Sequence, residues 1–350
     1  MSRTGDMKWY EKQGPGSEIA VSTRVRLARN VQGLPFGQRL TQEQAESLID
    51  RVEEAARRAA DPFQTVRMDQ LPPQRRADLY EKHLISREMM NKAPAALLIS
   101  QDEARSIMVN EEDHLRVQVM SAGQSLDQCL EEALRVGALL EESLSFSYDQ
   151  QLGYLTQCPT NLGAGLRASV MLHLPLLTRT GQIDGVISAA SKVGLEIRGL
   201  YGEGSRAQGE MYQVSNSVTL GFYEQELCEK LKDAAESIVR QEQALRQAFR
   251  QQYPGQLEDR VWRAAGLLRY ARRMSGQEAE ALLSDLRLGV CCGVLAGVEP
   301  CRLNQLIYQI KPACLETAAG RPLEPEERDA ARADLLRQAL AEIREKGSGE

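Results

Sequence analysis

Two short segments of the sequence combine the residue types that transfer of a phosphoryl group to a basic acceptor requires. Residues 110–116 read Asn-Glu-Glu-Asp-His-Leu-Arg, so a run of carboxylates precedes an arginine. Residues 158–169 form a Pro- and Gly-rich segment that runs into Arg167. Carboxylates can hold a cationic acceptor, and arginines can bind a polyanionic donor. The two segments therefore predict a site that holds a cation against a polyanion.

The carboxylates of the first segment could hold a cationic acceptor, and a guanidinium group is one such cation. A guanidinium has a pKa above about 12 and is a poor nucleophile while it is protonated. A kinase that acts on it needs a carboxylate that binds the group through two hydrogen bonds and accepts its proton as the N–P bond forms. Outside such a site, three consecutive acids between two strands are most simply a solvated turn.

Four arginines, Arg24, Arg26, Arg116 and Arg167, lie beside expected strand ends or loops. Scattered arginines are ordinarily surface or salt-bridge residues. This sequence contains no G-x-x-x-x-G-K-[ST] motif, so a P-loop does not bind the triphosphate. Arginine side chains together with Mg²⁺ can supply the same electrostatic stabilisation. We therefore expect a phosphate site that is lined by arginines.

Two segments, residues 163–168 and 202–207, match the G-x-G-x-x-A pattern of dinucleotide-binding folds. The second leads into a strand-like segment at residues 211–214 instead of a helix. The first follows the Cys-Pro-Thr-Asn sequence of residues 158–161, and no convincing acid closes a βαβ unit after it. Neither match supports a Rossmann fold.

Together with Ser-Thr-Arg-Val-Arg-Leu-Ala-Arg-Asn at residues 22–30, the two segments resemble the phosphagen (guanidino) kinases, which transfer phosphate between ATP and a guanidinium group. The resemblance implies that Glu112 orients and deprotonates the acceptor and that Glu203 assists it. It also implies that Arg116 and Arg167 offset charge on the transferring phosphoryl group. ATP is the implied donor, with Mg²⁺ held mainly through the nucleotide and no metal bound by protein side chains. The implied nucleotide contacts are Ser22, Thr23, Arg24, Val25, Arg26, His83, Arg116, Arg167, Ala168, Ser169, Val170, Met171, Arg198, Gly199, Leu200, Tyr201, Gly202 and Glu203.

The sequence departs from that family at residues 198–206, where the family carries a flexible loop that closes over the substrate. Tyr201 stands where enzymes for small guanidino metabolites have an arginine, and Arg206 stands near a position where they have an acid. The identity of the second carboxylate is therefore open. Cys158 lies beside the substrate in the family, so we expect it to be accessible and sensitive to oxidation without acting as a covalent nucleophile.

Within this superfamily the chain looks like the bacterial protein-arginine kinases of the McsB type. In creatine and arginine kinases a helical domain precedes the segment that matches residues 22–30. In this sequence that segment begins at residue 22, and helical patterns follow the catalytic motifs instead. Arg-Asp-Ala-Ala-Arg-Ala at residues 328–333 matches the element that binds phosphoarginine allosterically in that family, through Arg328, Asp329, Arg332 and Ala333. On charge pattern alone, Arg328 and Arg332 would be an ordinary i, i+4 helix face.

The resemblance implies protein substrates with exposed arginines, a role in stress response, the marking of proteins for Clp proteolysis, and a homodimer. The implied partners are a zinc-binding activator protein, a heat-shock transcriptional repressor and a Clp ATPase or protease. Two alternatives stay open: a kinase for free arginine, and a catalytically weak adaptor that binds phosphoarginine. The set of Glu112, Arg116 and Arg167 argues against the adaptor, whereas Tyr201 and Arg206 are its best support.

The composition is typical of a soluble globular protein with one or two domains, since 42% of the 350 residues are hydrophobic and 26% are charged. The net charge of −6 argues against direct binding of nucleic acid. Without an apolar signal core or a membrane-spanning segment, we expect a cytoplasmic protein with no membrane association. The seven cysteines show no disulfide spacing, and no C-x-x-C pair supports a zinc site.

The elements that must position these residues alternate between strands and helices up to residue 222. Apolar runs predict strands at residues 20–24, 95–100, 105–110, 115–120 and 195–200, and one or two more within 211–222. Helical patterns occur at residues 41–60, with Thr41 as N-cap, at 126–146 and at 182–192, and we expect residues 167–174 to open a helix. Only helices are expected later, at residues 224–251, 261–273, 277–288, 303–310 and 326–344.

This pattern predicts an α+β fold. With the resemblance, we expect a guanidino-kinase catalytic domain at residues 1–250, with a mainly antiparallel sheet flanked by helices. An all-helical regulatory or dimerisation domain is expected at residues 256–350.

Overall fold

The computed structural model describes residues 7–199 and 207–346. Its centre is an eight-stranded antiparallel sheet with the strand order β2-β3-β4-β5-β1-β8-β10-β9. Its strands are β1 (Ala20–Arg29), β2 (Phe63–Arg67), β3 (Ala96–Ser100), β4 (Arg105–Val109), β5 (Leu115–Ala122), β8 (Leu166–His173), β9 (Leu195–Gly199) and β10 (Met211–Asn216). Two short ladders pair β6 (Tyr148–Asp149) with β7 (Gly153–Tyr154), and β11 (Leu295–Ala296) with β12 (Arg344–Glu345). The predicted antiparallel α+β architecture is confirmed.

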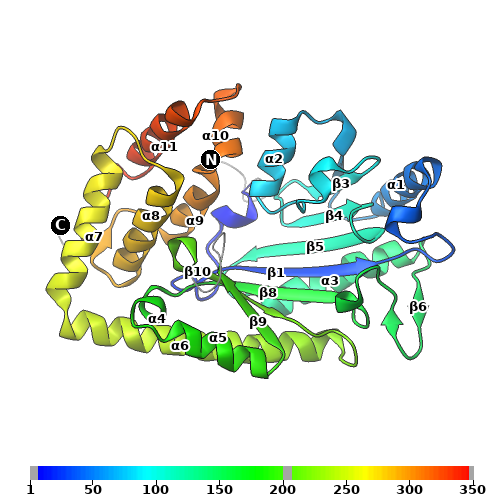
Figure 1. Cartoon of the computed structure of the whole chain (residues 1–350), viewed down its shortest axis with the longest axis horizontal. Helices are drawn as coiled ribbons and strands as arrows, with labels where there is room; N and C mark the ends of the chain where they lie inside the picture. Colours follow the sequence, from blue (N-terminus) through cyan, green and yellow to red (C-terminus); the bar gives the residue numbers. More distant parts are fainter. Residues whose placement is uncertain (1–6, 200–206, 347–350) are drawn as a thin grey trace.

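The helices fall into two groups (Figure 1). One group packs against a face of the sheet: α1 (Gln42–Ala56), α3 (Leu126–Glu141), α5 (Ile183–Lys192) and α6 (Glu224–Gln252). The other group lies beside the sheet: α7 (Pro254–Tyr270), α8 (Gly276–Cys291), α9 (Pro300–Gln309), α10 (Pro312–Ala319) and α11 (Pro325–Ala339). The remaining α-helices are α2 (Pro73–Glu81) and α4 (Pro175–Arg179), and the 3-10 turns are η1 (Trp9–Glu11), η2 (Gly37–Arg39), η3 (Met68–Gln70), η4 (Met89–Asn91), η5 (Pro159–Asn161) and η6 (Gln208–Glu210).

The central strand β1 shows how the sheet separates its two faces. Side chains alternate along a strand, so residues two apart lie on the same face. Val25 and Leu27 are fully buried among the helices of the first group. Arg24 and Arg26 alternate with them and are only partly buried. The helices therefore cover one face of the sheet, while arginines line the other.

The start of α1 follows directly from the local sequence. Thr41 is the N-cap: its hydroxyl accepts a hydrogen bond from the Gln44 amide, and the Gln44 side chain accepts one from the Thr41 amide. This capping box satisfies two amides that the first turn leaves without partners. Leu48, Ile49 and Val52 follow at helical spacing and are fully buried. The predicted N-cap is confirmed.

The second group of helices has an apolar core of its own, and α6 joins it to the sheet. Leu227 and Leu231, in the first half of α6, are buried in the core beneath the sheet. Phe249, near its end, packs against the core of α7–α11. Figure 1 shows α6 running along both groups. Helices α6 and α7 meet at residue 253, between residues 250 and 256, where we expected the first domain to end and the second to begin. The division into two domains stays a prediction.

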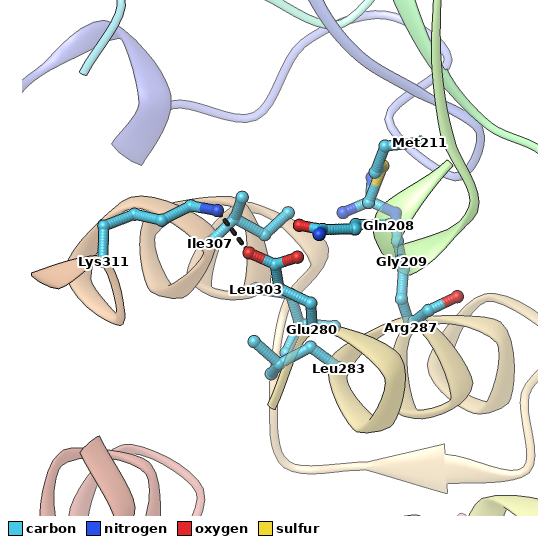
Figure 2. A pocket seen from close by; sticks show the side chains of 10 residues that line it. Gln208, Gly209, Met211, Glu280, Leu283, Arg287, Leu303, Ile307 and Lys311 are labelled. Carbon is cyan, nitrogen blue, oxygen red and sulfur yellow. Dashed lines mark hydrogen bonds and ion pairs between the residues drawn. The ribbon is translucent and has the colours of Figure 1, made fainter. Parts of the chain in front are cut away.

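Polar contacts connect the second group of helices to the segment that precedes β1. A small hollow lies near these contacts. The Arg287 guanidinium, which is 1% exposed, donates to the carbonyl of Ser17 at 2.5 Å and to Asn304 at 2.5 Å. The hollow lies between η6, α8 and α9 and is lined by Met211, Leu283, Leu303 and Ile307, with an ion pair between Lys311 and Glu280 at its side (Figure 2).

One predicted element is wrong, and another is shorter than expected. Residues 167–174 do not open a helix, because this segment is β8, which pairs with β1 on one side and with β10 on the other. Hydrogen bonds from both neighbouring strands outweigh the local resemblance to a helix start. The helix expected at 126–146 ends at Glu141, and Phe146 forms a β-bridge with Val31. Helices α2, α4 and α10 and strand β2 were not predicted. The region expected to be all helical also contains the short ladder of β11 and β12.

Several other predicted elements are confirmed with shifted ends. The segment at residues 211–222 contributes a single strand, β10. Residues 254–260 belong to α7 because Pro254 occupies its first turn, a position where proline fits a helix. Within the described ranges, no helix is long and apolar enough to cross a membrane.

Removal of the Thr41 hydroxyl tests the assignment of Thr41 as the N-cap of α1. Thr41→Ala removes the hydroxyl that accepts from the Gln44 amide, and we expect the free energy of unfolding to fall by about 1 kcal/mol. Urea denaturation followed by circular dichroism measures the change. Thr41→Ser keeps the acceptor and should stay within a few tenths of a kcal/mol of the parent protein. Equal stability of the Ala and Ser variants would contradict the assignment.

Candidate active site

The three consecutive acids after β4 have three different environments. Glu111 is 1% exposed and accepts a hydrogen bond from Arg116 Nη1 at 2.9 Å. Glu112 accepts one from Arg116 Nη2, also at 2.9 Å, but its side chain is 34% exposed. Asp113 is fully buried. Only Glu112 therefore combines a fixed position with access to a ligand.

Asp113 and His114 fix the backbone of this loop. One oxygen of Asp113 accepts from the Asn30 side chain and from the Gln157 amide, each at 2.7 Å. His114 Nδ1 accepts from the Val31 amide at 2.9 Å, so its Nε2–H donates to the Pro35 carbonyl, also at 2.9 Å. Because both side chains are buried, they tie the acidic loop to the segments that follow β1 and β7.

The surroundings of Glu112 shift its proton affinity. Burial raises the pKa of the Glu112 carboxyl, Arg116 opposes this rise, and the charges of Asp113 and Glu111 add to it. The result is a pKa above the ordinary glutamate value. A carboxylate with a raised pKa accepts a proton more readily, which suits a general base near neutral pH.

Antiparallel pairing brings the arginines together on the open face of the sheet. Arg26 in β1 lies directly opposite Arg167 in β8, and Arg24 lies opposite Ser169. Across β10, Gln213 lies opposite Arg198 in β9. Gln213 also accepts a hydrogen bond from Arg24 at 3.2 Å. Arginines that are far apart in the sequence therefore become neighbours.

Like charges at this spacing repel one another, and two sets of carboxylates compensate for part of the repulsion. Burial lowers the pKa of the Arg26 guanidinium well below its ordinary value, and the charges of nearby arginines lower it further. Glu196 accepts from Arg167 at 2.8 Å and from Arg198 at 2.6 Å. Glu111 and Glu112 each accept a hydrogen bond from Arg116. Such a face attracts a polyanion.

Three adjoining hollows lie along this face. The first is lined by Arg26, Glu112, Arg116, Cys158, Thr160 and Arg167 among others. The second is lined by Arg24, Arg26, Arg167, Arg198, Gly199, Gln213 and Ser215. The third is lined by Ser22, Arg24, His83, Met120, Ser169, Met171, Gln213 and Tyr308. Each hollow shares two lining residues with the next, so together they form one row.

The character of the row changes along its length. Glu112 and Cys158 mark one end, arginines dominate the middle, and two methionines with Tyr308 mark the other end. Burial lowers the pKa of His83 to about 3, and the charge of Arg24 adds to this effect, so the imidazole is neutral at physiological pH. A neutral, partly apolar end suits a nucleobase better than a phosphate.

Cys158 lies at the mouth of the first hollow and is partly exposed. Its Sγ lies 3.0 Å from the hydroxyl of Thr160, in the turn η5 that opens the Pro- and Gly-rich segment. The structure thus places this thiol next to the candidate base Glu112 and the arginines.

Several expected site residues lie elsewhere. Alternation along β1 and β8 directs the side chains of Thr23, Val25, Ala168 and Val170 to the opposite, buried face. Nucleotide contact from these positions is therefore limited to the main chain. Leu200, Tyr201, Gly202, Glu203 and Arg206 lie outside the described residues.

The candidate phosphoarginine element lies in α11, in the second group of helices beside the sheet (Figure 1). Arg332 is 3% exposed and donates to the carbonyls of Ile310 and Met274 at 2.9 and 2.8 Å, and to Asp329. Arg328 donates to Glu316 at 3.3 Å. Ala333 is buried in the helical core. Arg328 and Asp329 are thus the more accessible members.

Sequence reasoning missed several residues that shape the row. Once β10 is known to be a strand, the alternation of its side chains places Gln213 and Ser215 on the same face. Glu196 and Met120 depend on strand register, which the sequence does not specify. Tyr308 comes from α9, and nothing in its local sequence points to the row.

The donors along the row do not fit a metal ion held by the protein alone. Among residues 7–199 and 207–346, no three His, Cys, Asp or Glu side chains come together in a way that could hold one. Glu112 is the one carboxylate among the residues that line the first hollow. Divalent cations such as Mg²⁺ prefer several oxygen ligands.

The chain matches two family models and many curated proteins. Residues 44–245 match the ATP:guanido phosphotransferase C-terminal catalytic domain, and residues 254–350 match the C-terminal domain of protein-arginine kinase McsB. A protein-arginine kinase from Desulforamulus reducens is 45% identical over 339 residues, covering 95% of each chain. One from Bacillus subtilis is 40% identical over 336 residues, covering 95% of this chain and 93% of the relative.

Solved structures of guanidino kinases share the fold. Lombricine kinase aligns with a TM-score of 0.60 at 24% identity, covering 68% of this chain and 71% of its own. The duplicated taurocyamine kinase from Schistosoma mansoni, solved with components of a transition-state analogue, aligns with a TM-score of 0.60 at 26% identity over 71% of this chain and 36% of its own. With two family models and full-length relatives in agreement, the chain belongs to the protein-arginine kinase family of ATP:guanido phosphotransferases, and it is a kinase.

Proposed function

We propose that the protein transfers the γ-phosphoryl group of ATP to the guanidinium of arginine side chains in proteins. The observation that carries this proposal is the first hollow, where the partly exposed carboxylate of Glu112 faces Arg26, Arg116 and Arg167. Such a site brings a base for the acceptor within reach of cations for the donor. The names of the full-length relatives and the match of residues 254–350 support a protein substrate.

In this mechanism the acceptor arginine enters at the Glu112 end of the row. The Glu112 carboxylate binds the guanidinium and orients one nitrogen toward the γ-phosphorus. As the N–P bond forms, the bond between the γ-phosphorus and the β,γ-bridging oxygen breaks and ADP leaves. The acceptor nitrogen gives its proton to Glu112, which releases it to solvent. Glu203 remains our proposal for the second carboxylate.

The arginines stabilise charge during the transfer. Arg116 and Arg167 act on the oxygens of the transferring group, while Arg24, Arg26 and Arg198 hold the rest of the triphosphate. In comparable enzymes an arginine on the transition-state charge contributes roughly 10³ to 10⁵ in rate. The substrate is Mg·ATP, with the ion bound by phosphate oxygens. Ser22, Ser169, Met171 and His83 contact the nucleoside end.

Family membership also supports a wider role in this proposal. The protein acts in the cytoplasm in stress response, as a homodimer, and marks proteins for Clp proteolysis. Its partners are a zinc-binding activator, a heat-shock transcriptional repressor and a Clp ATPase or protease. Phosphoarginine binds allosterically at α11 through Arg328 and Asp329, with Arg332 fixing the helix.

Removal of the base is the first test. Glu112→Gln keeps the shape of the side chain but cannot accept a proton, so we expect the acid-labile phosphate on arginine of a casein-like substrate to disappear. Radiolabelled ATP measures the transfer, and calorimetry should show nearly unchanged ATP binding. Glu131→Gln makes the same chemical change at an exposed position of α3 and should retain full activity. Substantial arginine phosphorylation by Glu112→Gln would refute the mechanism.

The pH dependence of the reaction tests the environment of Glu112. Because the base must be ionised, kcat/KM for the acceptor falls as pH falls through the pKa of this carboxyl in the free enzyme. Burial raises that pKa, so the acid limb should lie above the ordinary glutamate value of 4.5. Rates at acceptor concentrations well below KM measure it, with ATP binding followed over the same pH range. An acid limb at or below 4.5 would count against Glu112 as the base.

Competition with free arginine separates a protein kinase from a kinase for the free amino acid. We expect millimolar arginine to leave phosphorylation of a casein-like protein nearly unchanged and to yield little phosphorylated amino acid. Thin-layer separation of the labelled products measures both outcomes. Strong inhibition together with formation of free phosphoarginine would favour the metabolite kinase.

A further inference from the structure

We propose that Tyr308, in α9 of the C-terminal helical group, binds the nucleobase of ATP, so that the helical group completes the nucleotide site. The inference deepens the proposed function, on which it rests for ATP as the donor. Tyr308 lies in sequence far from every motif that marks the catalytic site. It nevertheless lines the third hollow together with Ser22, His83, Met120 and Met171.

The order of the three hollows fixes which part of the nucleotide reaches Tyr308. Transfer to an acceptor beside Glu112 places the γ-phosphate in the first hollow, and the arginines of the second hollow then hold the remaining phosphates. The third hollow shares Arg24 and Gln213 with the second. The nucleoside, which follows the α-phosphate, therefore extends into the third hollow.

The chemistry of the third hollow suits a planar base. Two methionine side chains and the ring of Tyr308 give it apolar and aromatic walls, and the neutral imidazole of His83 adds a polar edge. The enclosed space of the hollow is about 20 Å³, so a base enters it only with a shift of the side chains that line it. Aromatic side chains bind bases through their faces with little dependence on base identity.

The position of Tyr308 is fixed from three directions. Its ring meets that of His83 edge-on, with the centroids 6.0 Å apart. On another side it meets the rings of Trp9 and Tyr10 at 5.9 and 5.3 Å. Since α9 packs on η1, and Gln305 donates to Glu11 at 2.7 Å, the helical group holds this ring in place (Figure 1).

The hydroxyl of Tyr308 also has a defined state. Burial raises the pKa of this phenol, and the positive charge of Arg24 opposes the rise. The phenol therefore stays protonated at physiological pH and can donate a hydrogen bond. It acts as a neutral positioning group next to the first arginine of the phosphate site.

The test compares two ligands that differ only in the nucleoside. Binding of ATP and of inorganic triphosphate to the full chain is measured by calorimetry without any acceptor, so the outcome does not depend on arginine phosphorylation. Tyr308→Ala should weaken ATP about tenfold or more and leave triphosphate unchanged. Tyr308→Phe should keep most of the affinity for ATP. Should Tyr308→Ala fail to fold, Tyr308→Leu keeps much of the bulk and should give the same pattern.

Two control variants separate base binding from packing. Trp9→Phe alters the same aromatic cluster but not the lining of the hollow, so it should lower Tm without changing the ratio of ATP to triphosphate affinity. Tyr270→Ala, at a 69% exposed position of α7, should change neither quantity. The inference is overturned if Tyr308→Ala leaves ATP binding intact, weakens both ligands equally, or shifts the ratio no more than Trp9→Phe does.

Discussion

The structure depends on the crowding of guanidinium groups on one face of a sheet. Arg24, Arg26 and Arg167 lie within one patch, and Arg26 is deep enough that burial and its neighbours both disfavour its charge. Like charges in such a setting destabilise a fold unless carboxylates are interleaved with them. Glu196 and the pair formed by Glu111 and Glu112 supply that compensation. Under the proposed function, the triphosphate of ATP adds to this compensation.

The rest of the fold can be understood as support for this patch. An antiparallel sheet places residues of distant segments opposite one another, and Arg26 meets Arg167 only because of the register of β1 and β8. The helices cover the other face, so the side chains between the arginines can anchor in an apolar core. Asp113 and His114 then fix the acidic loop at the end of the row.

The sequence predicted the parts of this arrangement that depend on local signals. The capping box at Thr41 and the helical spacing after it required no tertiary information. The motifs around Glu112 and Arg167 pointed to two segments that line the same hollow. The segment at residues 167–174 was misread because pairing with two neighbouring strands, and not local preference, makes it β8.

Other features could not be predicted from the sequence because they depend on tertiary packing and strand register. Nothing in three consecutive acids reveals that Glu111 is buried and Glu112 is accessible, because burial depends on the loops that pack around them. Glu196 bridges Arg167 and Arg198 only because the strand register places the three side chains close together. Tyr308 lines the third hollow only because of the way α9 packs, which no local pattern specifies.

The continuity of α6 has a consequence for dissecting this protein. Its 29 residues span roughly 43 Å as one uninterrupted rod. A fragment cut at residue 250 would keep that rod but lose the helices against which Phe249 packs, leaving an apolar stripe facing water. Truncation near the helix junction therefore exposes apolar surface, which favours aggregation of the fragment.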